Sequence, residues 1–309
     1  MKNKRVIVIA GATASGKTDL GIAVALATGG EIVSADSMQI YKGMDIGTAK
    51  ASADEQKLVR HHMIDVADPR ENYSVARYVE EASACCDMLR QEGKVTVIVG
   101  GTGLYIDSRL AGRSFGKQTK DETLRQRLSE EYEAEGGEKL LEKLSSFDPD
   151  RAALLHPADK KRIVRAMEVY YLSGKTRTAY AIEPELRKQY DFTFIVLEPP
   201  REILYERIEE RVNIMFEQGL EQEVKSLLES GYTKDSPALK AIGYHEWFES
   251  TDKEEIKAKI IHNTRKYAKK QYTYIRDIPG SIIVPFKNPV EDLYKVQDIL
   301  KKRLSGQAR

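Results

Sequence analysis

Residues 11–18 have the composition and spacing of a phosphate-binding loop, G-x-x-x-x-G-K-T. In such a loop the backbone N–H groups turn inward around phosphate oxygens, and the lysine reaches the outer phosphate. The threonine hydroxyl is offered to Mg²⁺ at the N-terminus of the next helix. The pattern predicts a bound phosphate and a magnesium ion and leaves the reaction open. The residues predicted to bind the phosphates are Gly11, Thr13, Ala14, Ser15, Gly16, Lys17 and Thr18, with Thr18 also meeting the metal.

Two further apolar segments end in residues that could do chemistry. Residues 31–35 run into Asp36, and residues 95–99 run into a glycine-rich turn that contains Thr102. ATPases and GTPases with this kind of loop normally carry a magnesium-binding aspartate after such a strand. Because glycines and a threonine stand there instead, the sequence argues against ordinary nucleotide hydrolysis.

The segments that must position these residues alternate between strand and helix patterns. Strand patterns occupy residues 6–10, 31–35, 95–99, 192–197 and 282–284, and helix patterns occupy 19–28, 74–92, 201–230 and 253–276. This alternation predicts an α/β fold whose core is a P-loop NTPase-like, three-layer parallel sheet. Charged, helix-favouring residues predict a mostly helical insertion domain at 114–190. The core is then expected in two parts, residues 1–113 and 191–309.

Composition limits the class of protein. The 309 residues carry a formal net charge of +1. No apolar run approaches the roughly 20 residues that a membrane span needs, so a soluble, cytoplasmic protein without a membrane partner is expected. Cys85 and Cys86 are adjacent on a predicted helix, which argues against a disulfide or a zinc site. The neighbouring His61 and His62 lack further metal-type partners, which favours polar packing or contact with RNA.

Although the net charge of the chain is close to zero, one segment is strongly basic. Residues 257–276 contain seven lysines and arginines, three tyrosines and no acidic residue. On a helix, Arg265, Lys269, Tyr272 and Arg276 share one face, which would suit contact with an RNA backbone and its bases. A solvated helix face is the alternative that composition leaves open.

Seven motifs in order make the chain resemble the bacterial tRNA dimethylallyltransferases, also called tRNA isopentenyltransferases, along nearly its whole length. The phosphate-binding loop is the first of them. The others are D-S-M-Q-I-Y-K-G-M-D-I-G-T-A-K at 36–50, H-H-M-I-D at 61–65, V-G-G-T-G-L-Y-I at 99–106, D-K-K-R-I-V-R-A-M-E-V at 159–169, A-I-G-Y at 241–244 and T-R-K-Y-A-K-K-Q at 264–271. His245, Trp247 and Tyr274-Ile275 depart from the family pattern, which bears on tRNA contacts and not on the reaction.

The resemblance implies transfer of a dimethylallyl group from dimethylallyl diphosphate to N6 of adenosine 37, on the 3′ side of the tRNA anticodon. The phosphate loop would then hold the leaving diphosphate, together with Mg²⁺. The resemblance assigns Asp36 as general base. From its position alone, this role and capping of the next turn are equally favoured. It places Thr102 near the target nucleotide. It also implies a diphosphate-binding arginine, which matches Arg211, with Arg207 as competitor.

A base stacked inside an anticodon loop cannot reach Asp36, so the nucleotide must be flipped and the RNA-contacting surface must be large. Gln39 offers the donor and acceptor pair that an adenine edge requires. The enzyme is expected to act as a monomer on the anticodon stem-loop. The residues expected to contact tRNA are Asp36, Ser37, Met38, Gln39, Lys161, Arg162, Arg165, Lys240, Gly243, Tyr244, Arg265 and Lys269.

Three other functions remain as alternatives. A P-loop nucleotide kinase would use Asp36 to hold an acceptor hydroxyl. An adenylate-type isopentenyltransferase would prenylate free nucleotides, and an RNA-binding module would use its loop as a regulatory ATP switch. The missing aspartate after residue 99 counts against the switch, and the basic segment counts against the free-nucleotide enzyme.

Overall fold

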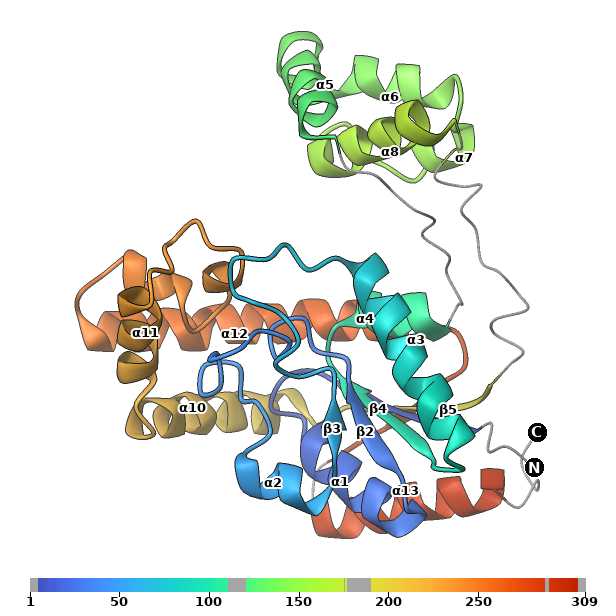
Figure 1. Cartoon of the computed structure of the whole chain (residues 1–309), viewed down its shortest axis with the longest axis vertical. Helices are drawn as coiled ribbons and strands as arrows, with labels where there is room; N and C mark the ends of the chain where they lie inside the picture. The colour runs from blue at the N-terminus through green and yellow to red at the C-terminus, as the bar shows by residue number, and fades with distance from the viewer. Residues whose placement is uncertain (1–4, 111–120, 175, 177–189, 287–288, 305–309) are drawn as a thin grey trace. The chain divides into compact units, whose positions relative to one another are not determined.

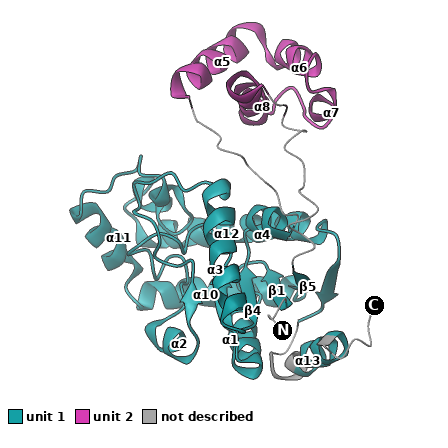
Figure 2. Ribbon diagram, turned by 45° about the vertical axis from the view of Figure 1, so that its right-hand side comes forward, with its two compact units in different colours: residues 1–110, 188–309 teal, residues 111–187 magenta. Residues whose placement is uncertain are grey.

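The structure is a computed structural model, and it describes residues 5–110, 121–174, 176, 190–286 and 289–304. The chain forms two compact units, one made of Met1–Leu110 with Lys188–Arg309 and the other of Ala111–Arg187 (Figure 2). The boundary expected between residues 113 and 114 lies outside the described residues. The boundary expected after residue 190 falls at the start of a core strand.

A six-stranded parallel sheet forms the core of the first unit. Its strands are β1 (Arg5–Gly11), β2 (Glu31–Ser34), β3 (His61–His62), β4 (Thr96–Gly100), β5 (Asp191–Leu197) and β6 (Ser281–Val284). They lie in the order β3-β2-β4-β1-β5-β6. In register, Ala10 of β1 pairs with Gly100 of β4, and Ser34 of β2 pairs with Val99. The turns that follow β1, β2 and β4 therefore meet at one edge of the sheet, where ligands of open α/β sheets bind.

Helices cover both faces of this sheet (Figure 1). On one face, α1 (Lys17–Thr28) and α13 (Pro289–Leu304) pack against Ile7 and Ile9. On the other, α3 (Val75–Gln91), α4 (Gly103–Leu110) and the end of α12 (Lys253–Arg276) pack against Val6 and Val8. Because successive side chains of a strand point to opposite faces, one apolar strand supplies both cores. The predicted three-layer α/β core is confirmed.

A third apolar cluster forms beside the sheet around residues 40–49. It gathers side chains from α10 (Arg201–Glu217), α11 (Leu220–Glu229), η1 (Ala238–Lys240) and α12, and the short helices α2 (Ala53–Leu58) and η2 (His245–Phe248) belong to the same unit. The helix expected over 201–230 is two helices, because Gly219 at φ +97° interrupts it. The helix expected over 253–276 is confirmed as α12. The sequence did not predict α2, β3 or α13.

The second unit is helical and has its own core. It contains α5 (Glu122–Glu135), α6 (Gly137–Ser145), α7 (Pro149–Ala152) and α8 (Lys160–Ser173). Leu128, Leu140, Leu144, Ile163 and Met167 pack together inside it. The buried carboxylate of Glu168 pairs with Arg125 at 2.9 Å and with Arg165 at 2.6 Å. The helical character expected of the insertion is therefore present, with internal packing of its own.

Cysteine and histidine side chains behave as packing groups. Cys85 and Cys86 are free thiols. His61 contacts the Val59 carbonyl at 2.8 Å, and His62 contacts Glu31 at 2.6 Å. In the parts of the chain that the structure describes, no group of three or more metal-type side chains gathers. Nor does any described helix have both the length and the apolar character that crossing a membrane requires.

Candidate active site

The turn between β1 and α1 has the backbone of a phosphate-binding loop. Ala14 at φ +62° and Gly16 at φ +88° adopt left-handed conformations that curl the chain. Gly16 caps α1 without a side-chain hydrogen bond, so the first N–H groups of the helix are left for a ligand. The Ser15 hydroxyl is buried and bonds to no described residue, so it can also donate to a phosphate oxygen. Apolar residues of α10 and α12 pack behind the loop.

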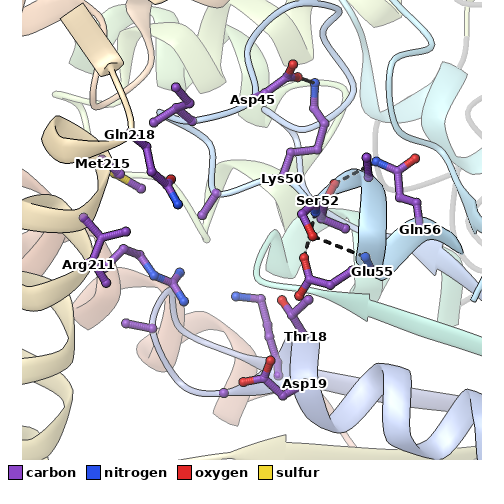
Figure 3. A pocket seen from close by; sticks show the side chains of 18 of the residues that line it. Thr18, Asp19, Asp45, Lys50, Ser52, Glu55, Gln56, Arg211, Met215 and Gln218 are labelled. Atoms are coloured by element: carbon purple, nitrogen blue, oxygen red, sulfur yellow. Dashed lines mark hydrogen bonds and ion pairs between the residues drawn. The ribbon is translucent and has the colours of Figure 1, made fainter. Parts of the chain in front are cut away.

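A cavity of about 530 Å³, here called the loop cavity, opens in front of this turn (Figure 3). Thr18 and Asp19 line it from α1, Glu55 from α2, and Arg211 from α10 on the other side. Burial and, to a smaller extent, the positive charge of Arg211 lower the pKa of Lys17 to about 8, and the charge of Asp36 opposes the shift. Lys17 and Arg211 line this cavity and form no ion pair with a carboxylate of the described residues, which favours an anionic ligand.

A second cavity of about 320 Å³, here called the Asp36 cavity, adjoins the first. Ala49, Arg211 and Met215 line both cavities, so they form the boundary between them. Its lining combines polar groups of the Asp36 turn and of α12 with apolar side chains from α10, from α12 and from residues 241–242 after η1. The lining residues outside the shared ones are Thr13, Asp36, Ser37, Met38, Gly47, Thr48, Ile208, Val212, Lys240, Ala241, Ile242, Ile260, Thr264, Tyr267 and Gln271.

The two roles considered for Asp36 are compatible. Its Oδ1 accepts hydrogen bonds from the N–H groups of Met38 at 2.9 Å and Gln39 at 3.4 Å. This is the turn-capping role. The other carboxylate oxygen bonds to no described residue and remains able to accept a proton at the cavity wall.

Thr102 lies behind the Asp36 turn and lines neither cavity. Its hydroxyl accepts the Ser37 N–H at 2.9 Å and donates to the Ser37 hydroxyl at 3.3 Å. Both of these hydrogen bonds are made with the turn that carries Asp36. A direct contact between Thr102 and a target nucleotide stays a prediction.

Arg211, which was expected to bind the diphosphate, lines the loop cavity beside the phosphate loop. Its Nη1 donates to the Thr13 hydroxyl at 3.3 Å. Burial lowers the pKa of the Arg211 guanidinium, and the carboxylates of Asp19 and Asp36 oppose that shift. Arg207, the competitor one turn earlier, lines neither cavity. The geometry favours Arg211.

The sequence assigned no role to Gln271, and the structure gives it a central one. This side chain is buried on α12. Its Oε1 accepts the Thr13 N–H and its Nε2 donates to the Gly101 carbonyl, each at 2.9 Å. It therefore ties the phosphate loop to the turn after β4. Its spacing from Thr264 and Tyr267, at seven and four residues, was the available signal that these three share a helix face.

Three of the residues expected to contact tRNA are engaged within the protein instead. The Gln39 amide accepts from the Ser34 hydroxyl at 3.2 Å, and its nitrogen donates to the carbonyls of residues 48 and 49 at 3.3 and 3.0 Å. Its nitrogen donates both protons within the protein, and its oxygen keeps one acceptor position. Tyr244 is fully buried, and the buried Gly243 donates its N–H to Glu246 at 2.9 Å. The structure thus places these three side chains or backbone groups in internal contacts, and their direct contact with tRNA stays a prediction.

The face of α12 that the sequence assigned to RNA is not the face at the Asp36 cavity. Arg265 pairs with Glu209 at 2.8 Å, and Arg276 pairs with Glu198. Lys269 and Arg276 line a separate cavity of about 290 Å³. With 3.6 residues per turn, these positions lie nearly opposite the face that carries Gln271. Lys240 is the basic residue of the expected set that lines the Asp36 cavity.

The three basic residues expected to contact tRNA from the insertion lie on the first turns of α8. Lys161 and Arg162 are exposed, and Arg162 lies 3.6 Å from Asp159. Arg165 pairs with the buried Glu168. Their contact with tRNA stays a prediction.

Known proteins resemble this chain in sequence. The model of a family described as IPP transferase matches residues 39–278. A protein named tRNA dimethylallyltransferase from an Exiguobacterium species is 44% identical over 280 residues, covering 89% of this chain and 88% of its own. A protein of the same name from Geobacillus thermodenitrificans is 39% identical over 302 residues, covering 96% of both chains.

Solved structures resemble it as well. The full-length tRNA isopentenylpyrophosphate transferase of Bacillus halodurans superimposes with a TM-score of 0.72 at 33% identity, covering 99% of this chain and 98% of its own. A eukaryotic dimethylallyltransferase described as acting on tRNA gives a TM-score of 0.80 at 27% identity, covering 98% of this chain and 80% of its own. Because the agreement extends over nearly the whole chain in both sequence and structure, the protein belongs to the IPP transferase family.

Proposed function

We propose that the protein transfers a dimethylallyl group from dimethylallyl diphosphate to N6 of the adenosine next to the tRNA anticodon, giving N6-dimethylallyladenosine and diphosphate. The observation that carries this proposal is the boundary between the two cavities. Arg211 lines both of them, with the phosphate loop on one side and Asp36 on the other. A donor spanning that boundary would present its allylic carbon next to the acceptor.

The loop cavity suits the leaving group. As the allylic C–O bond breaks, negative charge develops on the diphosphate, and preorganised donors stabilise it most effectively in a site that excludes water. The N–H groups at the start of α1, the Lys17 ammonium and the Arg211 guanidinium supply such donors. The hydrogen bond from Arg211 to Thr13 holds the guanidinium toward the loop.

The Asp36 cavity suits the acceptor. The exocyclic nitrogen of adenine is a weak nucleophile, but its proton becomes acidic once the nitrogen begins to bond to carbon. The free oxygen of Asp36 can then take that proton. Ile208, Val212 and Met215 line this cavity and offer an apolar surface to the allyl chain.

Mg²⁺ is part of this proposal, and the donor set fits it. Thr18 lines the loop cavity together with Asp19 and Glu55, which are the oxygen donors that Mg²⁺ prefers. Burial raises the pKa of Asp19, and so does the charge of Glu55, a repulsion that a cation would relieve. Thr18, water and the diphosphate would hold the ion. When bound, it would neutralise charge on the leaving group.

The RNA partner follows from the relatives, which are named for action on tRNA. Ser37, Met38 and Lys240 line the Asp36 cavity and would contact the flipped nucleotide. A monomeric, cytoplasmic enzyme and a strict preference for the dimethylallyl donor stay predictions.

The kinase, the free-nucleotide enzyme and the ATP switch are not favoured, since relatives that cover most of the chain are named tRNA dimethylallyltransferase.

Mass spectrometry of the acceptor tests the proposal. The protein is incubated with Mg²⁺, dimethylallyl diphosphate and either an unmodified anticodon stem-loop or AMP. We expect one dimethylallyl group on the stem-loop adenosine and none on AMP, and no transfer by an Arg211→Ala variant. Transfer to AMP alone would establish the free-nucleotide enzyme, and turnover of ATP without transfer would establish the kinase or switch.

A further inference from the structure

Residues 45–50, here called the partition loop, form a wall of both cavities. Asp45, Ile46 and Lys50 line the loop cavity, and Gly47 and Thr48 line the Asp36 cavity. Ala49 lines both. The shape of each cavity therefore depends on where this one short segment sits.

A single carboxylate holds the partition loop from outside. Glu223 lies on α11 and lines neither cavity. Its Oε2 accepts the N–H groups of Asp45 at 2.9 Å and Ile46 at 2.7 Å, and its Oε1 accepts the N–H of Gly47 at 3.0 Å. Three successive N–H groups converging on one carboxylate make a nest of the kind that binds anions.

The buried Tyr244 completes this contact. Its hydroxyl donates to Oε1 of Glu223 at 2.7 Å. A Cβ placed on Gly47 would lie 2.5 Å from the Tyr244 ring, so the loop fits closely against the tyrosine. The carboxylate thus has four donors, from the loop and from the residue under the loop. Tyr244 is a supporting residue of this contact.

The loop needs such support because its backbone is not relaxed. Ala49 has φ +49°, a left-handed conformation that alanine rarely adopts. Two other polar side chains, those of Lys50 and Gln39, also stabilise the loop. Lys50 pairs with Asp45 at 2.5 Å and Asp65 at 2.6 Å, and the Gln39 amide holds the carbonyls of residues 48 and 49. Glu223 alone holds the N–H groups of residues 45–47 among the described residues.

We propose that Glu223 is a positioning residue for the transfer reaction. Its carboxylate fixes the partition loop, and through the loop it fixes the width of both substrate cavities without touching either substrate. The kinetic part of this inference rests on the proposed function. Both carboxylate oxygens are needed as acceptors, because an amide in their place would turn its own N–H groups toward donors of the loop.

The test compares Glu223→Gln with Glu221→Gln. Glu221 lies on the same helix, and its carboxylate pairs with Lys225 at 2.8 Å and Lys253 at 2.5 Å, away from the partition loop. Hydrogen exchange followed by mass spectrometry reports the amides of residues 45–47. Calorimetry reports pyrophosphate affinity, and steady-state kinetics report kcat and the KM of each substrate.

For Glu223→Gln we expect faster exchange confined to the partition loop, with pyrophosphate affinity lowered and the KM of both substrates raised about tenfold. Glu221→Gln should leave all of these unchanged. Tyr244→Phe, which removes one of four donors, should give a smaller change in the same direction. Glu223→Asp keeps the charge and should recover part of the loss.

Two results would overturn the inference. One is faster exchange in residues 45–47 with unchanged pyrophosphate affinity and unchanged KM values, which would make the loop position irrelevant to binding. The other is a general loss of exchange protection with normal kinetics per folded molecule, which would make Glu223 a stability residue only. Failure of the wild-type protein to prenylate RNA would refute the proposed function instead, and the exchange and pyrophosphate measurements would still test Glu223.

Discussion

The amide of Gln271 bridges two turns that are far apart in the sequence. Its oxygen accepts the Thr13 N–H and its nitrogen donates to the Gly101 carbonyl, each at 2.9 Å. Because the side chain is buried, both backbone groups depend on it for their hydrogen bonds. Gln271 thereby fixes the phosphate loop relative to the turn after β4.

Gln271→Leu should destabilise the protein by about 1–3 kcal/mol, since it leaves the buried Gly101 carbonyl and the half-buried Thr13 N–H without this partner. Pyrophosphate affinity should fall as well, because the loop loses an anchor at Thr13. Urea unfolding and calorimetry measure the two effects. Gln126→Leu, at an exposed position on α5, is the matched control and should change neither. Normal pyrophosphate affinity in Gln271→Leu would remove Gln271 from the binding site.

Asp36→Asn separates the two roles of this side chain. The asparagine oxygen can still accept the N–H groups of Met38 and Gln39, so the turn and the stability should be kept. The loss of a proton acceptor should lower the single-turnover rate of transfer by about 10² to 10⁴. Affinities for pyrophosphate and for the anticodon stem-loop should change little. A rate close to wild type would exclude Asp36 as the general base.

Pyrophosphate binding should weaken as the pH rises through 8. Burial holds the pKa of Lys17 at about 8, so its positive charge is present below that pH and is lost above it. Pyrophosphate also changes its protonation in this pH range. The Lys17→Arg variant keeps its positive charge, so its affinity serves as the reference that corrects for the titration of pyrophosphate. The ratio of wild-type to Lys17→Arg affinity should be level below pH 8 and fall above it. A level ratio from pH 7 to pH 9.5 would contradict the assignment.

Stability should respond to Lys17 in the opposite sense. The native state gives up this proton near pH 8, whereas the unfolded chain keeps it up to the ordinary lysine value of 10.5. The unfolded state therefore binds more protons between those two values, and the Lys17 contribution to the free energy of unfolding rises with pH across that window.

Lys240→Ala should weaken binding of the stem-loop and lower the slope of log affinity against log salt by about one, because Lys240 lines the Asp36 cavity. Lys269→Ala tests the other side of α12. The same change in slope for Lys269→Ala would extend the RNA path to that face of the helix. An unchanged slope would assign Lys269 to a solvated surface.

The parts of the site that the sequence predicted well are local. A strand, the pattern G-x-x-x-x-G-K-T and a helix follow one another within residues 5–28, so the phosphate loop needs no distant partner to be recognised. Asp36 was recognised in the same way, as the residue after an apolar strand. Parallel pairing of β1, β2 and β4 then brings these turns to one edge of the sheet.

The parts of the site that the sequence could not supply depend on distant contacts. Tyr244 meets Glu223, and Gln39 is held by the carbonyls of residues 48 and 49. Periodicity places Arg265 and Lys269 on one face of α12, but it does not say toward which neighbour a face turns. That direction is set by packing, since Ala268 lies against the phosphate loop cluster and Ile275 lies in the sheet core.

The order of strands in the sheet also affects how the chain folds during its synthesis. β1 lies between β4 and β5 in the sheet, yet the whole second unit separates β4 from β5 along the chain. During synthesis from the N-terminus, one edge of β1 therefore waits without its partner until the second unit has left the ribosome. An unpaired apolar edge is open to wrong pairing. The second unit has an apolar core of its own, so its packing does not depend on the completion of the sheet.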